Sequence, residues 1–266
     1  MIDRRPAARG VARGLAALVL AAIACLPAHA DNVATIARVK NSVVAIGTYE
    51  RTRTPQFQFF GTGFAVGDGT VVVTNAHVLP PVLDPAKMET VAILTAAPAK
   101  EGRPQAQVRE AKRLAIDPGA DLALLKIDGP PLPPLRLRDS DTVREGQEIL
   151  MTGFPVGAVL GPFAATHRGI IAAITPIAIP QPRAADLDAG TLRRLTTGTF
   201  PVFQLDATAY PGNSGSPIYD PDTGDVLGIV NMVLVKSTKE SALKDPTGIT
   251  YAIPARHLKA LLDQAR

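Results

Sequence analysis

Short runs of apolar or alternating residues recur along most of the chain, separated by clusters of glycine, proline and polar residues. Runs of this kind, bounded by turn residues, are typical of β-strands. They cover residues 43–49, 57–66, 70–74, 91–95, 108–116 and 122–127 in the first half, and 148–152, 169–175, 202–206, 216–219, 226–235 and 249–253 in the second. Because no long helical pattern lies between them, each half is predicted to form a β-barrel or a β-sandwich.

A proline-rich segment separates the two groups of strands. Residues 129–134 contain four prolines, which cannot join a β-ladder and favour an extended spacer. We therefore expect an N-terminal β-domain over residues 31–135 and a C-terminal β-domain over residues 136–254. Helical spacing of apolar residues predicts a short helix before the first strand and another over residues 255–266.

The first 30 residues are predicted to be a secretory signal. Four arginines and an apolar run precede Ala28-His29-Ala30, the layout of a signal peptide with an A-x-A cleavage site. The segment 1–30 holds four of the 28 basic and one of the 24 acidic residues, so the net charge falls from +4 to +1 without it. Cys25, the one cysteine, leaves with it. We expect an exported protein, periplasmic or extracellular, with no disulfide, no stable membrane anchor after cleavage and no affinity for nucleic acid.

The segment Tyr210-Pro211-Gly212-Asn213-Ser214-Gly215-Ser216-Pro217 places a serine between two glycines. Such a turn can direct several main-chain N–H groups toward one side of the hydroxyl, which is the arrangement that acyl transfer requires. Glycine supplies the positive φ that the turn needs, and proline ends it. Taken alone, the segment also fits an ordinary surface turn.

Histidines are scarce, and His77 is the best candidate partner for Ser214. It follows the apolar run at residues 70–74, where a hydrogen-bonded turn histidine is the alternative. Asp121 opens the run at residues 122–127, and a carboxylate there is costly to bury without a donor. Because an imidazole N–H is a suitable donor, His77, Asp121 and Ser214 are predicted to form a Ser-His-Asp triad. His167 is a less favoured candidate, and His257 is expected to be solvated on the last helix.

Several segments, in this order, resemble the chymotrypsin-fold serine peptidases and in particular their HtrA/DegP group. They are residues 61–64, 73–78, 117–127, 138–141, 153–157, 204–207, 211–215, 228–231 and 248–254. The resemblance covers nearly all of the chain after the leader. It implies an all-β fold of two six-stranded antiparallel β-barrels with a short C-terminal helix. The active site would lie between the barrels, with His77 and Asp121 from the first and Ser214 from the second.

The resemblance also implies the other site residues. The N–H groups of Gly212 and Ser214 would form the oxyanion hole, with Asn213 between them as a spacer. The specificity pocket would be lined by Thr208, Ala209, Tyr210, Val230, Asn231, Met232 and Val233, none of which is charged. Because no acid is present to select lysine or arginine, and Val233 replaces a glycine that keeps large pockets open, a small or medium aliphatic P1 side chain is expected. The main chain of residues 231–233 would pair with the substrate as an added strand.

The chain departs from related groups in three places. It stops at Arg266, where the HtrA group usually carries a PDZ domain, so regulation by such a domain is expected to be absent. Val230 stands where glutamyl endopeptidases carry a histidine, which makes a glutamate preference unexpected. Asn213 stands where trypsin-like zymogens carry the aspartate that binds a newly cut N-terminus. Order in the oxyanion loop would then depend on neighbouring loops, with residues 157–167 and 184–198 as candidates.

Two functions remain open. The first is an exported serine endopeptidase that hydrolyses unfolded or exposed polypeptides through an acyl-enzyme, with no metal and no organic cofactor. The sequence contains no H-E-x-x-H string, which argues against a metalloprotease. The second is a peptide-binding or chaperone-like protein on the same scaffold, with a collapsed oxyanion loop. Phe57, Phe59 and Phe60 could make a subunit contact in a homo-oligomer such as a trimer, or belong to a core strand, which we favour.

Overall fold

The computed structural model describes residues 32–100, 103–155, 157, 163–176, 200–231 and 249–265. Several predicted features lie outside these residues. They are the leader, the loop at 184–198, residues 158–162 of the candidate loop at 157–167, and the pocket residues Met232 and Val233.

Within the described residues, twelve strands form two closed antiparallel barrels of six strands each. The first barrel, in spatial order β1-β2-β3-β6-β5-β4, contains β1 (Val43–Tyr49), β2 (Phe57–Val66), β3 (Val71–Asn75), β4 (Thr90–Lys100), β5 (Arg103–Asp117) and β6 (Leu122–Ile127). The second, in the order β10-β11-β12-β9-β8-β7, contains β7 (Glu148–Gly153), β8 (Ala165–Pro176), β9 (Pro201–Asp206), β10 (Pro217–Tyr219), β11 (Val226–Asn231) and β12 (Ile249–Pro254). The predicted all-β fold of two six-stranded barrels with a short C-terminal helix is confirmed.

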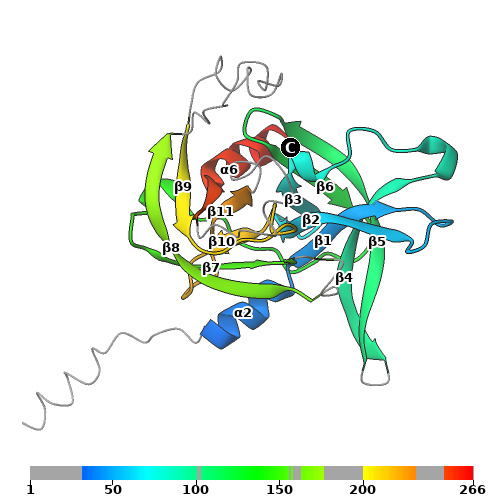
Figure 1. Ribbon diagram of the computed structural model, residues 1–266, viewed down its shortest axis with the longest axis horizontal. Helices are drawn as coiled ribbons and strands as arrows, with labels where there is room; N and C mark the ends of the chain where they lie inside the picture. Colours follow the sequence, from blue (N-terminus) through cyan, green and yellow to red (C-terminus); the bar gives the residue numbers. More distant parts are fainter. Residues whose placement is uncertain are drawn as a thin grey trace, which may run out of the picture.

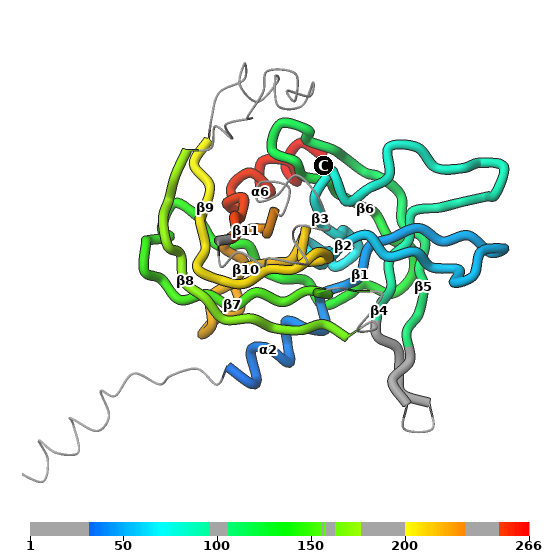
Figure 2. The backbone as a smooth tube through the Cα atoms, viewed as in Figure 1, coloured from blue at the N-terminus to red at the C-terminus, as the bar shows by residue number. Residues whose placement is uncertain are grey.

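Two α-helices and three short 3-10 turns complete the described elements. They are α2 (Asn32–Lys40), α6 (Ala255–Gln264), η1 (Ala76–Val78), η2 (Pro85–Lys87) and η3 (Ser140–Thr142). Figure 1 shows the barrels side by side, with α6 lying between them. Although α2 precedes the first barrel in the chain, it lies beside β7 of the second barrel (Figure 2).

Three strands extend several residues beyond their predicted ends. β4 and β5 remain paired as far as Lys100 and Arg103, and β8 begins at Ala165 rather than at residue 169. Main-chain pairing needs no apolar side chain, so a hairpin can continue into polar residues that carry no alternating pattern.

Strand alternation explains why continuous apolar runs occur in β1 and β6. Successive side chains point to opposite faces of a strand, so Val44 and Ile46 fill the interior of the first barrel while Val43 and Ala45 face outward. The outward side chains are buried too, because they meet the second barrel. A run that is apolar at every position is therefore expected wherever both faces of a strand are covered.

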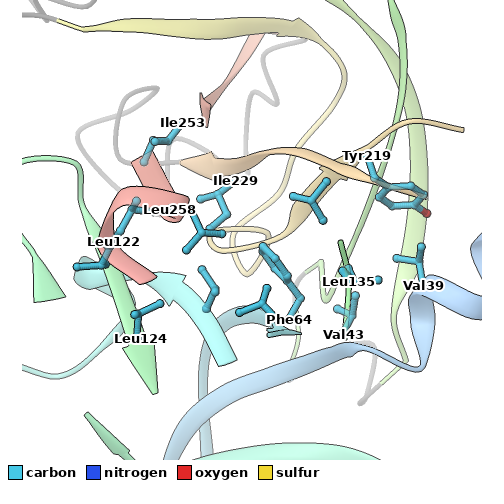
Figure 3. Close-up of a cluster of buried hydrophobic side chains, with 14 of the residues drawn as sticks. Val39, Val43, Phe64, Leu122, Leu124, Leu135, Tyr219, Ile229, Ile253 and Leu258 are labelled. Carbon is cyan, nitrogen blue, oxygen red and sulfur yellow. The ribbon is translucent and has the colours of Figure 1, made fainter. Parts of the chain in front are cut away.

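The cluster between the barrels joins every major part of the molecule (Figure 3). Its labelled members come from the first barrel, the second barrel, the connecting segment and both helices. They are Val43, Phe64, Leu122, Leu124, Tyr219, Ile229, Ile253, Leu135, Val39 and Leu258. This inter-barrel cluster is separate from the two barrel interiors. It therefore determines how the barrels, and the residues at their junction, are placed relative to each other.

The three phenylalanines in the first half of β2, Phe57, Phe59 and Phe60, are partly buried. Phe57 and Phe59 pack against the inter-barrel cluster, and Phe60 packs against the interior of the first barrel. These contacts are those of a core strand.

Candidate active site

His77 and Asp121 lie at the neighbouring ends of two paired strands in the first barrel. β3 and β6 run antiparallel, with Asn75 opposite Leu122, so the residue after β3 and the residue before β6 are close together. Asp121 has a φ of 54°, a left-handed conformation that aspartate adopts more readily than most residues. Its main-chain oxygen accepts hydrogen bonds from the N–H of Ala76 and from Nδ2 of Asn75, both at 3.1 Å. These bonds hold the backbone of Asp121 beside His77.

The structure brings the side chains of the three predicted triad residues into one hydrogen-bonded chain. Nδ1 of His77 lies 2.6 Å from Oδ2 of Asp121, and Nε2 of His77 lies 3.0 Å from Oγ of Ser214. A carboxylate only accepts, so Nδ1 donates and Nε2 is left to accept from the serine hydroxyl. The main-chain N–H of His77 also donates to Oδ1 of Asp121 at 2.9 Å. Asp121 and Ser214 are 5% and 6% exposed, whereas the His77 side chain between them is 28% exposed.

Asn231 provides a further donor to the same carboxylate. Its Nδ2 donates to Oδ2 of Asp121 at 2.8 Å, and the residue is 1% exposed. Sequence reasoning placed Asn231 only in the specificity pocket and missed this contact. A polar side chain at the end of the otherwise apolar strand β11 was the available signal, because a buried amide needs a partner.

The turn before Ser214 has the geometry of a type II β-turn. The N–H of Asn213 donates to the carbonyl of Tyr210 at 2.9 Å, and Gly212 has a φ of 103°. Type II turns require a positive φ at their third residue and favour proline at the second, the positions of Gly212 and Pro211. In a type I turn the peptide between these two residues would be flipped, and the N–H of Gly212 would point the other way.

Gly215 allows the first barrel to approach Ser214 closely. The N–H of Thr62 in β2 donates to the carbonyl of Ser214 at 2.8 Å. A Cβ atom at position 215 would lie 1.9 Å from the carbonyl oxygen of Thr62, and the φ of Gly215 is 87°. Any other residue at this position would push the serine away from the barrel that carries His77.

A comparison with protein-family models matches residues 61–229 to the trypsin-like peptidase domain. The match includes all three side chains of the hydrogen-bonded chain and covers more than half of the sequence. The chain belongs to the trypsin-like peptidase family.

Curated relatives of this trypsin-like domain include two proteins named as probable periplasmic serine endoproteases, DegP-like. One, from Marinomonas sp. (strain MWYL1), is 29% identical over 206 residues, which is 77% of this chain and 35% of the relative. Another, from Pseudomonas putida (strain W619), is 29% identical over 203 residues, which is 76% of this chain and 34% of the relative. The chain thus spans about a third of the length of these relatives.

Among solved structures, a variant of the HtrA-type protease AlgW, determined with a tripeptide, is similar to this trypsin-like domain. The TM-score is 0.59 at 24% sequence identity, over 88% of this chain and 62% of that chain. This likeness supports the fold.

The described residues of the predicted specificity pocket occupy different environments in the trypsin-like domain. Ala209 and Val230 are buried within the core cluster of the second barrel. Thr208 and Tyr210 are partly exposed beside the turn that precedes Ser214. None of these four side chains carries a charge.

Two other histidines lie outside the hydrogen-bonded chain. Burial lowers the pKa of His167, whose ring centroid lies 6.2 Å from that of Tyr210. The expectation that His257 is solvated was wrong, because its ring packs 4.2 Å from that of Phe200 and burial lowers its pKa. Helical periodicity could not foresee Phe200, which is distant in the sequence.

The described part of the chain has neither a candidate metal centre nor a candidate membrane-spanning helix. No group of three or more His, Cys, Asp or Glu side chains is arranged there to hold a metal ion. None of its helices combines the length and the apolar character needed to cross a membrane.

Proposed function

We propose that the protein is an exported serine endopeptidase in which Ser214 is the nucleophile, His77 the general base and Asp121 the residue that orients the base. The hydrogen-bonded chain from Asp121 through His77 to Ser214 is the observation that carries this proposal. Membership of the trypsin-like peptidase family supports the reaction class. The roles follow from the chemistry of each side chain at its place in the chain.

Hydrolysis would proceed through an acyl-enzyme. Oγ of Ser214 attacks the carbonyl carbon of the substrate while Nε2 of His77 takes the hydroxyl proton. Asp121, which is hydrogen-bonded to Nδ1 of His77, stabilises the imidazolium that forms. When the tetrahedral intermediate collapses, the C–N bond breaks and Nε2 gives its proton to the leaving amine. Water would then attack the acyl carbon while Nε2 takes its proton. The ester C–O bond breaks, Nε2 returns the proton to Oγ of Ser214, and the carboxylic acid is released.

The N–H groups of Gly212 and Ser214 are the proposed oxyanion donors. Neither group donates a hydrogen bond to another described residue, so both remain available to a ligand. The positive φ of Gly212 supports an open oxyanion turn over the collapsed form that would accompany a chaperone-like protein. Donors of this kind typically contribute about 100-fold or more to turnover.

The substrates are proposed to be unfolded or exposed polypeptides with a small or medium aliphatic P1 side chain. The described pocket residues Thr208, Ala209, Tyr210 and Val230 are uncharged, so they offer no partner to a charged P1 side chain. Main-chain pairing with residues 231–233 would make recognition largely independent of sequence. The predicted leader and the names of the relatives, which describe periplasmic proteins, support a periplasmic location.

The test is reaction of the purified protein with a fluorophosphonate probe, beside Ser214→Ala and His77→Ala, with casein cleavage measured in parallel. We expect the wild type to label and cleave. The Ser214→Ala variant should not label, and His77→Ala should lose at least about 1,000-fold in rate. A folded wild type that neither labels nor cleaves would contradict the proposal and favour the peptide-binding alternative.

A further inference from the structure

Thr62 of β2 has all of its polar atoms engaged around the turn that precedes Ser214. Its hydroxyl donates to the carbonyl of Gly212 at 2.7 Å and accepts from the N–H of Phe154 at 3.1 Å. Its main-chain N–H donates to the carbonyl of Ser214 at 2.8 Å, and its carbonyl accepts from the hydroxyl of Thr74 at 2.7 Å. Thr62 is 0% exposed, so water cannot substitute for these partners from outside.

Three of these four hydrogen bonds cross from one barrel to the other, whereas the bond from Thr74 lies within the first barrel. Thr62 belongs to the first barrel, whereas Gly212, Ser214 and Phe154 belong to the second. Thr62 therefore binds the turn on both sides of Asn213, at the two residues whose N–H groups are the proposed oxyanion donors. The Gly212–Asn213 peptide is held at both ends, because its carbonyl accepts from Thr62 and its N–H donates to Tyr210.

We propose that Thr62 is a positioning residue for the oxyanion hole. Its hydroxyl fixes the turn at Gly212 relative to Ser214, so that both N–H donors face the same point. This inference rests on the proposed function and adds to it the first-barrel residue on which the oxyanion hole depends. Displacement of donors by about 1 Å is enough to lower turnover by about 100-fold, which is why a residue that never touches substrate can control the rate.

Phe59, three residues earlier in β2, supports the same turn by packing. Its ring lies against the main chain of Gly157 and Gly212, since Cβ atoms added there would lie 2.2 Å and 3.0 Å from the ring. The ring also meets that of Phe154 edge-on, with centroids 6.4 Å apart. β2 thus holds the turn and the start of the 154–157 segment together, by a hydrogen bond at Thr62 and by an aromatic contact at Phe59.

Two variants, Thr62→Val and Thr62→Ser, separate the effect of the hydroxyl from that of the rest of the side chain. Valine keeps the shape but leaves the carbonyl of Gly212 and the N–H of Phe154 without this partner, whereas serine keeps the hydroxyl and loses only a methyl group. Thr48→Val is the matched control. Thr48 is also 0% exposed in the first barrel, but its hydroxyl accepts from Arg53 rather than contacting the turn.

The readouts separate positioning from general stability. We expect Thr62→Val to lower kcat about 10- to 100-fold with KM changed less than about threefold. Binding of a peptide aldehyde, which needs the oxyanion donors, should weaken by a similar factor. Binding of the matching peptide in which a methyl group replaces the aldehyde, so that no oxygen reaches these donors, should not change. Thr62→Ser and Thr48→Val should resemble the wild type in all three measurements.

Hydrogen exchange in peptides that cover residues 204–219 provides a readout that does not require activity. It should accelerate in Thr62→Val and remain unchanged in Thr62→Ser. If Thr62→Val does not fold, Thr62→Cys, whose thiol is a weak donor, should give an intermediate loss. Wild-type kcat and exchange in a folded Thr62→Val variant would overturn the inference, as would equal losses in kcat and in binding of the methyl-terminated peptide. A wild type that fails to react with fluorophosphonate would instead overturn the proposed function. The comparison of hydrogen exchange between Thr62→Val and the wild type would still test whether Thr62 holds the turn in place.

Discussion

The carboxylate of Asp121 accepts hydrogen bonds from groups that both barrels supply. His77 donates twice from the first barrel, through its main chain and Nδ1, and Asn231 donates from the second. The direction of the carboxylate, and with it the ring of His77, therefore depends on the barrels being correctly docked. Burial makes this dependence strong, because a misdirected carboxylate at 5% exposure has no water to replace a lost partner.

Gly212→Ala should abolish reaction with fluorophosphonate, whereas Gly146→Ala should not. Both glycines have positive φ, 103° and 82°, so alanine at either place costs about 1 kcal/mol of stability or more. At position 212 the added Cβ would also lie 2.3 Å from the carbonyl oxygen of Phe154, whereas at position 146 nothing lies within 4 Å. Labelling rates and melting temperatures of the two variants would check this. Equal labelling of both would mean that the turn tolerates a large displacement.

Among the elements, the segment after the proline-rich linker is attached to β11 by an isolated parallel β-bridge. Leu137 pairs in parallel with Val226, with main-chain bonds from Arg138 N–H to Val226 and from Val226 N–H to Arg136. The guanidinium of Arg136 meets the carboxylate of Asp225 through two hydrogen bonds, at 2.8 and 2.6 Å. The chain is thus fixed to the second barrel as soon as it leaves the first.

Asp225→Asn should lower stability at neutral pH and have no effect in strong acid. The hydrogen bonds from Arg136 lower the pKa of Asp225 below its usual value of 3.8. Because the folded state binds the proton less readily, the stabilisation is present above that value and is lost as the pH falls through the folded pKa. We expect a loss of about 1 kcal/mol at pH 7, reduced by salt because the Arg136 side chain is 77% exposed. Chemical unfolding of the wild type and of Asp225→Asn, at pH values from 7 to 2, measures this loss of stability. A difference that persists undiminished at pH 2 would contradict the assignment to this ion pair.

At the scale of the whole molecule, the inter-barrel cluster makes two barrels into one folding unit. Each barrel has its own interior, yet the outer faces of β1 and β6 are buried only when the second barrel and α6 are present. Separate barrels would expose this surface to water, which is unfavourable in proportion to its apolar area. Unfolding is therefore expected to be a single transition.

Leu258→Ala should destabilise both barrels together. Leu258 is 1% exposed in the inter-barrel cluster, and a buried leucine truncated to alanine typically costs about 2–5 kcal/mol. Leu262→Ala is the control, because Leu262 is only partly buried at the edge of the same cluster and should cost less than half as much. Thermal unfolding followed by circular dichroism and by residual peptidase activity should give coincident midpoints. Two separate transitions would show that the barrels are stable independently.

Much of the fold and of the candidate site could be predicted from the sequence, because both leave local patterns along the chain. Turn residues border β1 and β6, and their predicted bounds match the observed ones. The three residues of the hydrogen-bonded chain stood out because each is chemically unusual for its surroundings. Thr62 gave no such signal, since threonine is common in strands whatever its hydroxyl contacts. The contacts of His257 and Asn231 depend on residues far away in the chain, and periodicity carries no information about them.

The place of α6 in chain order has a consequence for biosynthesis. A ribosome delivers Ser214 before it delivers Leu258 and Leu261, which complete the inter-barrel cluster. Until those leucines emerge, the two barrels lack part of the surface that docks them, and the hydroxyl of Ser214 has no fixed place beside His77. A nascent chain that already contains Ser214 is thus expected to be harmless to the proteins around it, and the proposed proteolytic activity should appear only after α6 has emerged from the ribosome.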